Sequence, residues 1–158
     1  MSDEERSKWY FDFGEISEEI KDGSLDDPFD VLSMAVATRQ DVENGRSNSH
    51  FDLMMEGGTF AQISGIRSFI QNTIVRIIDE AESFSANGMN SREMATLEGE
   101  TRQIALDDTR VYKVNDVTVE DSSREYENEI KISMNLETDY ARYDAECFIG
   151  DQSALDAS

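Results

Sequence analysis

The stretch that decides the fold is "EIKISMNLETDYARYDAECFIG", residues 129–150. In both halves of this stretch apolar residues alternate with polar ones, which is typical of a strand with one buried face and one solvated face. The step "TD" between the halves is short enough to join antiparallel neighbours. The stretch therefore predicts two paired strands whose apolar positions are Ile130, Ile132, Met134, Leu136, Ala141, Tyr143, Ala145, Cys147 and Ile149.

A third strand is predicted upstream, in "RVYKVNDVTVE". Tyr112 and Val114 are out of phase with Val117 and Val119, which predicts a bulge at Asn115-Asp116. The connection "DSSR" to the next strand is again short. The C-terminal part of the chain is thus expected to form a three-stranded antiparallel meander.

Two helices are predicted before the meander. The first follows Ser64 and carries apolar residues at helical spacing over residues 66–81. The second begins with a capping box formed by Asn90 and Glu93, and Thr101 interrupts its apolar stripe, so we expect it to be half buried. Two main helices packed on the three-stranded meander give a two-layer α+β fold.

A small hairpin is predicted to precede these helices. Leu53 and Met55 continue an alternating pattern, and Gly57-Gly58 can supply the positive φ angles of a two-residue turn. Further upstream, Pro28 follows two aspartates that can cap a short helix, although "VLSMAVAT" also fits a buried strand. Both interpretations of that segment stay open.

The composition predicts one folded domain with two flanking segments. Residues 1–27 are rich in acids and contain a few aromatic residues without sustained periodicity, so we expect an arm that is flexible or docked on a partner. Residues 28–150 form the single α+β domain, and residues 151–158 a polar tail.

The charge balance excludes two classes of partner. The chain has 14 Lys+Arg against 35 Asp+Glu, a formal net charge of -21, so nucleic acid and anionic membranes are repelled at long range. Lysine is scarce and acids run along the whole chain, which favours a halophilic host. In concentrated salt the Debye length falls to about 3 Å and screens the repulsion between these acids.

No motif for catalysis, a cofactor or a metal is found in the sequence, so we expect no enzyme and no small-molecule substrate. His50 has no cysteine nearby and no metal-ligand spacing, and Cys147 falls on the apolar phase of its strand, which predicts an inert thiol. The N-terminus lacks the pattern of a classical export signal, and no stretch approaches the ~18 apolar residues of a membrane span.

Two motifs accompany the predicted helices. Gly65-Ile66-Arg67 stands at the start of the first helix, and "TRQIALDDTRVYKVNDVTVE" carries the end of the second helix into a valine-rich strand. Together with the order of elements, these motifs resemble the baseplate wedge, or sheath-initiator, family of contractile phage tails, in which a similar step begins one helix and a Glu-Pro-Arg motif ends the other. Asp108, Thr109 and Arg110 stand at the three motif positions. Thr109 replaces a proline and so loses its fixed φ angle, and the loop "ESFSANGMNSRE" is shorter than in the family.

The resemblance implies a structural role and not an enzymatic one. Asp108, Thr109 and Arg110 would dock the protein on baseplate wedge proteins, and an edge of its sheet would take strands from first-ring tail sheath subunits by β-augmentation. The tail tube is a further candidate partner. The expected location is the virion tail baseplate, after assembly in the host cytoplasm.

Other interpretations stay open beside the resemblance. Proteins of this family have been labelled lysozyme-like, but a muramidase needs two carboxylates held at a defined distance in a cleft, which a domain this small does not lead us to expect. The chain can also be another viral tail or connector component, or a halophilic protein-binding module without catalysis. Without the resemblance, Asp108 and Arg110 read as an intramolecular surface pair at a helix end.

Overall fold

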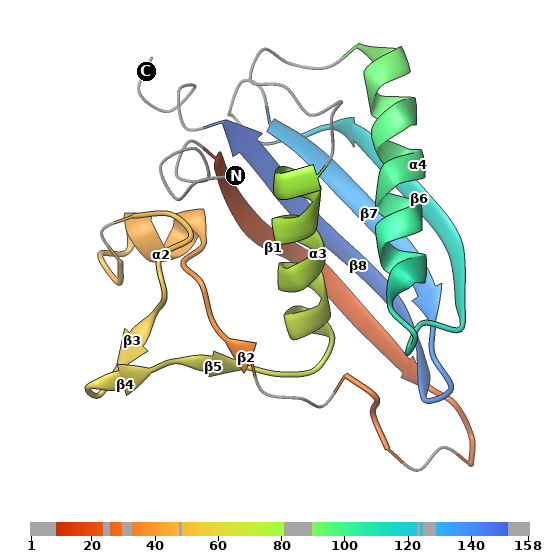
Figure 1. Ribbon diagram of the computed structural model, residues 1–158, viewed down its shortest axis with the longest axis horizontal. Helices are drawn as coiled ribbons and strands as arrows, with labels where there is room; N and C mark the ends of the chain where they lie inside the picture. The colour runs from red at the N-terminus through yellow and green to blue at the C-terminus, as the bar shows by residue number, and fades with distance from the viewer. Residues whose placement is uncertain are drawn as a thin grey trace.

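The fold is built on a four-stranded antiparallel sheet with the strand order β1-β8-β7-β6 (Figure 1). The computed structural model describes residues 9–23, 26–29, 33–47, 49–80, 90–122, 124 and 129–151. The strands of the main sheet are β1 (Trp9–Ile20), β6 (Lys113–Asp121), β7 (Glu129–Glu137) and β8 (Ala141–Asp151). The first of these strands in the chain therefore pairs with the last.

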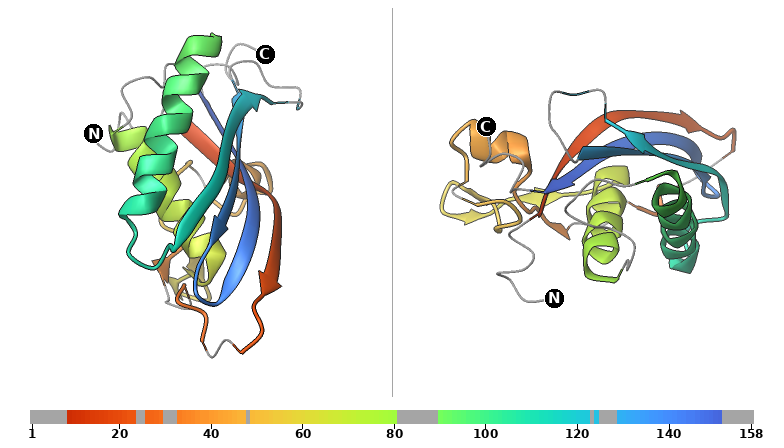
Figure 2. Two further views of the ribbon diagram at one scale, coloured as in Figure 1. Left: turned by 90° about the vertical axis from the view of Figure 1, so that its right-hand side faces the viewer. Right: turned by 90° about the horizontal axis from the view of Figure 1, so that it is seen from above.

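Helices α3 (Ile66–Glu80) and α4 (Ser91–Asp107) lie side by side on one face of this sheet (Figure 2). The core lies between the helices and the sheet and includes Ile70, Ile74 and Leu97 from the helices. The α+β class of the sequence prediction is confirmed, but the main sheet has four strands and not the three that were predicted.

The additional strand corrects the prediction for residues 1–27. Trp9–Ile20 form the edge strand β1, paired with β8 along its length, and not a free arm. The sequence pattern concealed the strand because Tyr10 and Phe11 are both fully buried although they are neighbours, so no alternation marks them. Residues 1–8 of the predicted arm lie outside the described part of the chain, as does the predicted tail beyond Asp151.

A shift of register divides β1 into two halves. The pairing with β8 shifts between Phe13 and Ile16. Gly14 lies at the shift, where a Cβ atom would be only 2.8 Å from the Cβ atom of Glu146, so this close approach of two strands requires glycine. The half before the shift is buried, whereas the half after it is mostly exposed.

The other strands follow the sequence prediction closely. The predicted apolar positions of β7 and β8 are all buried, and the positions between them face away from α3 and α4. In β6 the register against β7 shifts between Val114 and Asp116, which confirms the predicted bulge. Val117 and Val119 are buried after the shift.

The second helix begins as predicted, because Asn90 and Glu93 form the capping box of α4 with reciprocal hydrogen bonds. Thr101 does not interrupt the buried stripe. Its side chain is fully buried, together with Leu97 and Ile104 from the same face of the helix.

A small satellite of short elements lies beside β1 at the other end of the molecule from α4 (Figure 1). It contains β2 (Ser33–Met34), α2 (Arg39–Glu43), β3 (Met55–Glu56), β4 (Thr59–Phe60) and β5 (Gln62–Ile63). The predicted hairpin is confirmed as β3 and β4, with positive φ angles of 57° and 84° at Gly57 and Gly58. For the segment after Pro28, Ser33–Met34 are a strand, and residues 30–32 lie outside the described residues.

Candidate functional site

The sequence-predicted site lies at the junction of α4 and β6. Asp108 caps the helix with an extended backbone, φ -77° and ψ 115°. Arg110 donates hydrogen bonds from its backbone nitrogen and from Nε to Asp108 Oδ1, both at 2.9 Å, and from Nη2 to Oδ2 at 2.6 Å. These hydrogen bonds lower the pKa of Asp108 and raise that of Arg110. Thr109, between them, is exposed.

Arg110 also holds a distant segment of the chain. Its Nη1 lies 3.4 Å from the carbonyl oxygen of Pro28, and its guanidinium lies 5.0 Å from the ring centroid of Phe29. Phe29 is buried and stacks on Phe69 of α3 with ring centroids 4.8 Å apart. Residues 108–110, here called the seam, therefore join α4, β6 and residues 28–29 within the molecule. This agrees with the intramolecular interpretation, and the binding of a partner by the seam stays a prediction.

The two outer edges of the sheet differ in how they are covered. At the β6 edge, Glu98 Oε1 of α4 accepts a hydrogen bond from the backbone nitrogen of Val119, and Arg102 Nη1 donates to the carbonyl oxygen of Val114, both at 2.9 Å. These two side chains, one turn apart on α4, satisfy backbone groups that an added strand would need. The β6 edge is thus partly blocked.

The second half of β1 presents its edge differently. The backbone nitrogen of Lys21 donates to the carbonyl oxygen of Tyr140 at 2.8 Å, so Lys21 faces the β8 side of the ladder. Because residues of an antiparallel pair face the partner alternately, Ser17 and Glu19 bond β8, while the backbone groups of Ile16, Glu18 and Ile20 point away from the sheet. In the described part of the chain no strand pairs with this outer side of β1.

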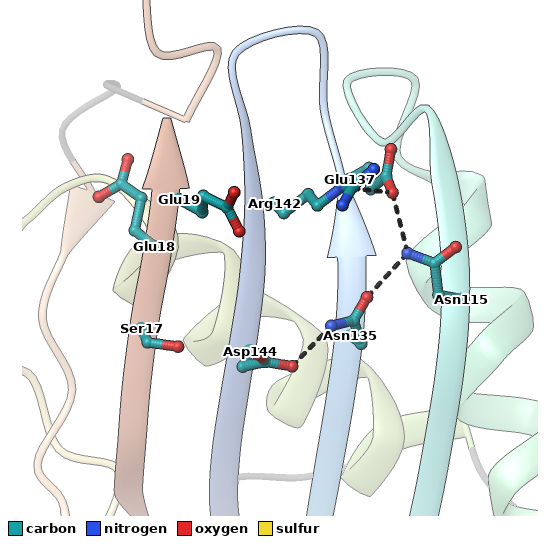
Figure 3. Close-up of a pocket in the computed structure, with 8 residues that line it drawn as sticks. All are labelled: Ser17, Glu18, Glu19, Asn115, Asn135, Glu137, Arg142 and Asp144. Atoms are coloured by element: carbon teal, nitrogen blue, oxygen red, sulfur yellow. Dashed lines mark hydrogen bonds and ion pairs between the residues drawn. The ribbon is translucent and has the colours of Figure 1, made fainter. Parts of the chain in front are cut away.

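The face of the sheet opposite α3 and α4 carries a shallow polar groove of about 360 Å³ (Figure 3). A row of hydrogen bonds crosses the strands there. Asn115 Nδ2 donates to Asn135 Oδ1 at 2.7 Å, and Asn135 Nδ2 donates to Asp144 Oδ1 at 2.6 Å. Arg142 pairs with Glu137 at 2.9 Å in the next row. The groove is therefore a surface for polar contacts, and its side chains already bond one another.

A second arginine cluster lies at the other end of this face. Arg124 donates from Nε and Nη2 to the two carboxylate oxygens of Glu129 at 2.7 and 2.6 Å, and its Nη1 lies 2.9 Å from Asp12 Oδ2. Glu129 also accepts from the hydroxyls of Tyr10 at 2.7 Å and Ser122 at 2.6 Å. The cluster ties the connection between β6 and β7 to β1.

Burial and hydrogen bonding act in opposite directions on these acids. Burial raises the pKa of Glu129, but the hydrogen bonds from Arg124, Ser122 and Tyr10 outweigh it, and the pKa of Glu129 lies below its usual range. For Asp12 burial prevails over its hydrogen bond from the backbone nitrogen of Gln40, and its pKa is raised. This cluster could not be predicted from the sequence, because Asp12 and Glu129 are far apart in the chain and each is one acid among many.

His50 and Cys147 are both buried, in different surroundings. His50 is buried with its ring 5.9 Å from that of Tyr10. Cys147 is fully buried on β8, and burial raises the pKa of its thiol to about 12. A protonated, enclosed thiol is a poor nucleophile, so the predicted inert role of Cys147 agrees with its surroundings.

Within the described residues no group of three or more His, Cys, Asp or Glu side chains is arranged to hold a metal ion. None of the described helices combines the length and the apolar character needed to cross a membrane. Comparison of the chain with family models, with curated proteins and with solved structures finds no match.

Proposed function

We propose that this protein is a structural component of a contractile tail baseplate, which docks on the wedge and initiates sheath assembly by accepting a strand at the edge of its sheet. The observation that carries the proposal is the uncovered outer edge of β1 from Ile16 to Ile20. Its partners would be baseplate wedge proteins and first-ring sheath subunits, with the tail tube as a further candidate. The protein would act without catalysis, at the virion tail baseplate after assembly in the host cytoplasm.

The difference between the two sheet edges supports strand addition at β1. A partner strand at β6 would have to displace the hydrogen bonds of Glu98 and Arg102. At β1 it would meet the outward backbone groups of Ile16, Glu18 and Ile20, which alternate as a β-augmentation site requires. Main-chain hydrogen bonds there would supply affinity that depends little on the salt concentration.

The seam supports a second contact, with the wedge. The Arg110 side chain is 35% exposed although it is fixed by Asp108 and lies over Phe29. A guanidinium held in one orientation loses little entropy when a partner carboxylate approaches it. Exposed Thr109 beside it offers a hydroxyl to the same partner.

The test of the β1 edge is a pair of substitutions at one position. Glu18→Pro removes an outward backbone donor and leaves the bonds of Ser17 and Glu19 to β8, because proline is tolerated on the free side of an edge strand. Glu18→Ala removes the side chain but keeps the donor. Each variant is co-expressed with candidate wedge and sheath subunits and purified in molar KCl, with the fold checked by circular dichroism.

We expect sheath subunits to be retained by the wild type and by Glu18→Ala and to be lost from Glu18→Pro. Retention by Glu18→Pro would reject the β1 edge as the site. For the wedge, Arg110→Ala is compared with Arg142→Ala, which removes an exposed arginine from the opposite face of the sheet. Equal recovery of wedge subunits by these two variants would reject docking at the seam.

A further inference from the structure

The edge of β1 that the proposed function uses is short and has clear ends. Its outward backbone groups belong to Ile16, Glu18 and Ile20. Before them the register against β8 shifts between Phe13 and Ile16, and such a shift interrupts the regular alternation of backbone groups. After them β1 ends at Ile20. An added strand can therefore pair regularly only with residues 16–20, here called the open edge.

The side chains of the open edge lie on two faces of the sheet. Ile16, Glu18 and Ile20 are opposite buried residues of β8, so their side chains point to the face on which α3 and α4 lie. Ser17 and Glu19 point to the other face and line its polar groove (Figure 3). Because directly opposite residues of paired strands point to the same face, each residue of an added strand would meet one of these side chains.

Two consecutive acids of the open edge have no cation beside them. Within the described residues, the carboxylates of Glu18 and Glu19 form no ion pair and accept no hydrogen bond. Arg142, which is directly opposite Glu19 on β8, pairs with Glu137 instead (Figure 3). Burial and the nearby carboxylate of Asp27 raise the pKa of Glu18. A cation placed beside these two acids would stabilise both.

Two acids on the inner strands of the sheet are, in contrast, paired within it. Glu137 on β7 is bound by Lys21 at 3.3 Å and by Arg142 at 2.9 Å. Asp144 on β8 accepts a hydrogen bond from Asn135 at 2.6 Å. The two acids without a cation thus lie at the position where a further strand would supply one.

The isoleucines at the two ends of the open edge require a different neighbour. Ile20 is 56% exposed, and Ile16 is partly buried against the core. Both point to the face of α3 and α4, so an apolar residue opposite each of them would extend the apolar layer of the core. Ser17 requires only a polar neighbour. In the order from Ile20 to Ile16, the residues of the added strand would therefore be apolar, basic, basic, polar and apolar.

The same acids disfavour a second copy of this chain as the added strand. If two open edges paired antiparallel about their centres, Glu18 would lie directly opposite Glu18 of the copy. Like charges that lie directly opposite each other on paired strands are destabilising. A strand with basic residues at these positions avoids the repulsion and gains attraction in its place.

We propose that the open edge takes an antiparallel strand of a partner protein with the pattern apolar-basic-basic-polar-apolar. Its two basic side chains lie opposite Glu19 and Glu18, and its two apolar side chains lie opposite Ile20 and Ile16. This inference rests on the proposed function, because it requires strand addition at β1. It adds the chemistry by which the partner segment is recognised.

The test compares two peptides of the same composition on the full chain in about 1 M KCl, where charges further apart than about 3 Å are screened. The first peptide has the core Val-Lys-Lys-Thr-Val, and the second has the core Lys-Val-Thr-Val-Lys between the same flanking residues. Equal charge controls for a general attraction of cations to a chain with a net charge of -21. Amide hydrogen exchange at Ile16, Glu18 and Ile20 reports whether a strand has been added.

We expect the first peptide to slow exchange at these three amides and to bind about fivefold or more tightly than the second. The double variant Glu18→Lys with Glu19→Lys should reverse the choice and prefer a peptide with the core Val-Glu-Glu-Thr-Val. Both positions are exposed, and circular dichroism checks the fold. The control variant Asp52→Lys with Glu56→Lys makes the same change of charge on the satellite and should keep the preference of the wild type.

The outcomes separate this inference from the proposed function. Equal binding of the two lysine peptides, with the same amides protected, would overturn the basic pattern and leave strand addition at β1 standing. Protection by neither peptide would reject the open edge itself, and the inference with it. Protection that rises with protein concentration without peptide would assign the edge to a second copy and would also overturn the inference.

Discussion

Arg110 and Arg124 make the same set of contacts at opposite ends of the sheet. Each uses Nε and Nη2 to bind both oxygens of one carboxylate, Asp108 in the first case and Glu129 in the second. Each guanidinium also lies over a phenylalanine ring, at 5.0 Å and 4.1 Å from its centroid. The two arginines differ in what surrounds them.

The carboxylate partners of Arg124 are enclosed and that of Arg110 is not. The side chains of Glu129 and Asp12 are 0% and 2% exposed, whereas Asp108 is 19% exposed and its arginine 35%. A buried charge that loses its partner keeps the full cost of desolvation, but a half-exposed one is stabilised by water. We therefore expect the same bidentate pair to contribute more to the free energy of unfolding at Arg124 than at Arg110.

The largest effect is expected for Arg124→Ala. This change leaves Glu129 and Asp12 buried without their shared cation, and we expect a loss of about 3–5 kcal/mol in the free energy of unfolding. Urea unfolding in molar KCl measures it. A loss below about 1 kcal/mol would show that water or protonation compensates these acids, and the contrast with Arg110 would disappear.

A smaller loss is expected for Tyr10→Phe. The change removes the hydroxyl that donates to Glu129 Oε2 at 2.7 Å but leaves Arg124 in place. A hydrogen bond to a charged group contributes about 1.5–3 kcal/mol, and we expect the lower end because Ser122 and Arg124 still bind Glu129. The same urea series measures it, and no change in stability would contradict a role for this hydroxyl in the cluster.

Arg110→Ala should cost less again. The pair is partly exposed, so after solvent screening we expect a loss of about 1 kcal/mol, including the contact with the Phe29 ring. Ultraviolet circular dichroism during urea unfolding measures it. If the loss equals that of Arg124→Ala, exposure does not set the difference between the two clusters.

The contribution of Arg110 should also depend on pH. Hydrogen bonding from Arg110 lowers the folded-state pKa of Asp108 below its unfolded value of about 3.9. The resulting stability is fully present above the unfolded pKa and is lost as the pH falls through the folded pKa. We therefore expect the difference between wild type and Arg110→Ala to be constant above about pH 5 and to shrink towards pH 3, and a constant difference over that range would contradict the assignment.

The smallest effect is expected for Lys131→Gln, a control on the same face of the sheet as Arg124. Lys131, which is half-buried, pairs at 3.1 Å with the exposed carboxylate of Glu120. We expect no measurable change in the urea midpoint, because exposed pairs of this kind contribute little. A clear destabilisation would mean that the acids of this face depend on every cation near them.

Sequence reasoning succeeded where a pattern was local. The alternation in β7 and β8, the bulge after Val114 and the capping box of Asn90 with Glu93 are each encoded within a few residues, and the structure confirms them. The hairpin turn at Gly57 and Gly58 is of the same kind, because both residues need a positive φ angle.

Sequence reasoning failed where residues that contact each other are far apart in the chain. The first half of β1 is buried without alternation and the second half is exposed. The alternation of buried and exposed residues that is typical of a strand is therefore missing from both halves. Asp12 and Glu129 form a cluster because both pair with Arg124. No spacing in the sequence connects Arg124 to Asp12. At the predicted site, Asp108 and Arg110 were placed together correctly, but the link of Arg110 to Pro28 and Phe29 required the fold.

The pairing of β1 with β8 affects how the chain folds during its synthesis. Tyr10 and its hydrogen-bond partner Glu129 are 119 residues apart, so contact order is high at this edge and folding is expected to be slow. During synthesis β1 leaves the ribosome long before its partner strand β8, which lies far later in the chain. Until β8 follows, Tyr10 and Phe11 have no partner strand to cover them, and the nascent chain exposes side chains that are buried in the folded protein.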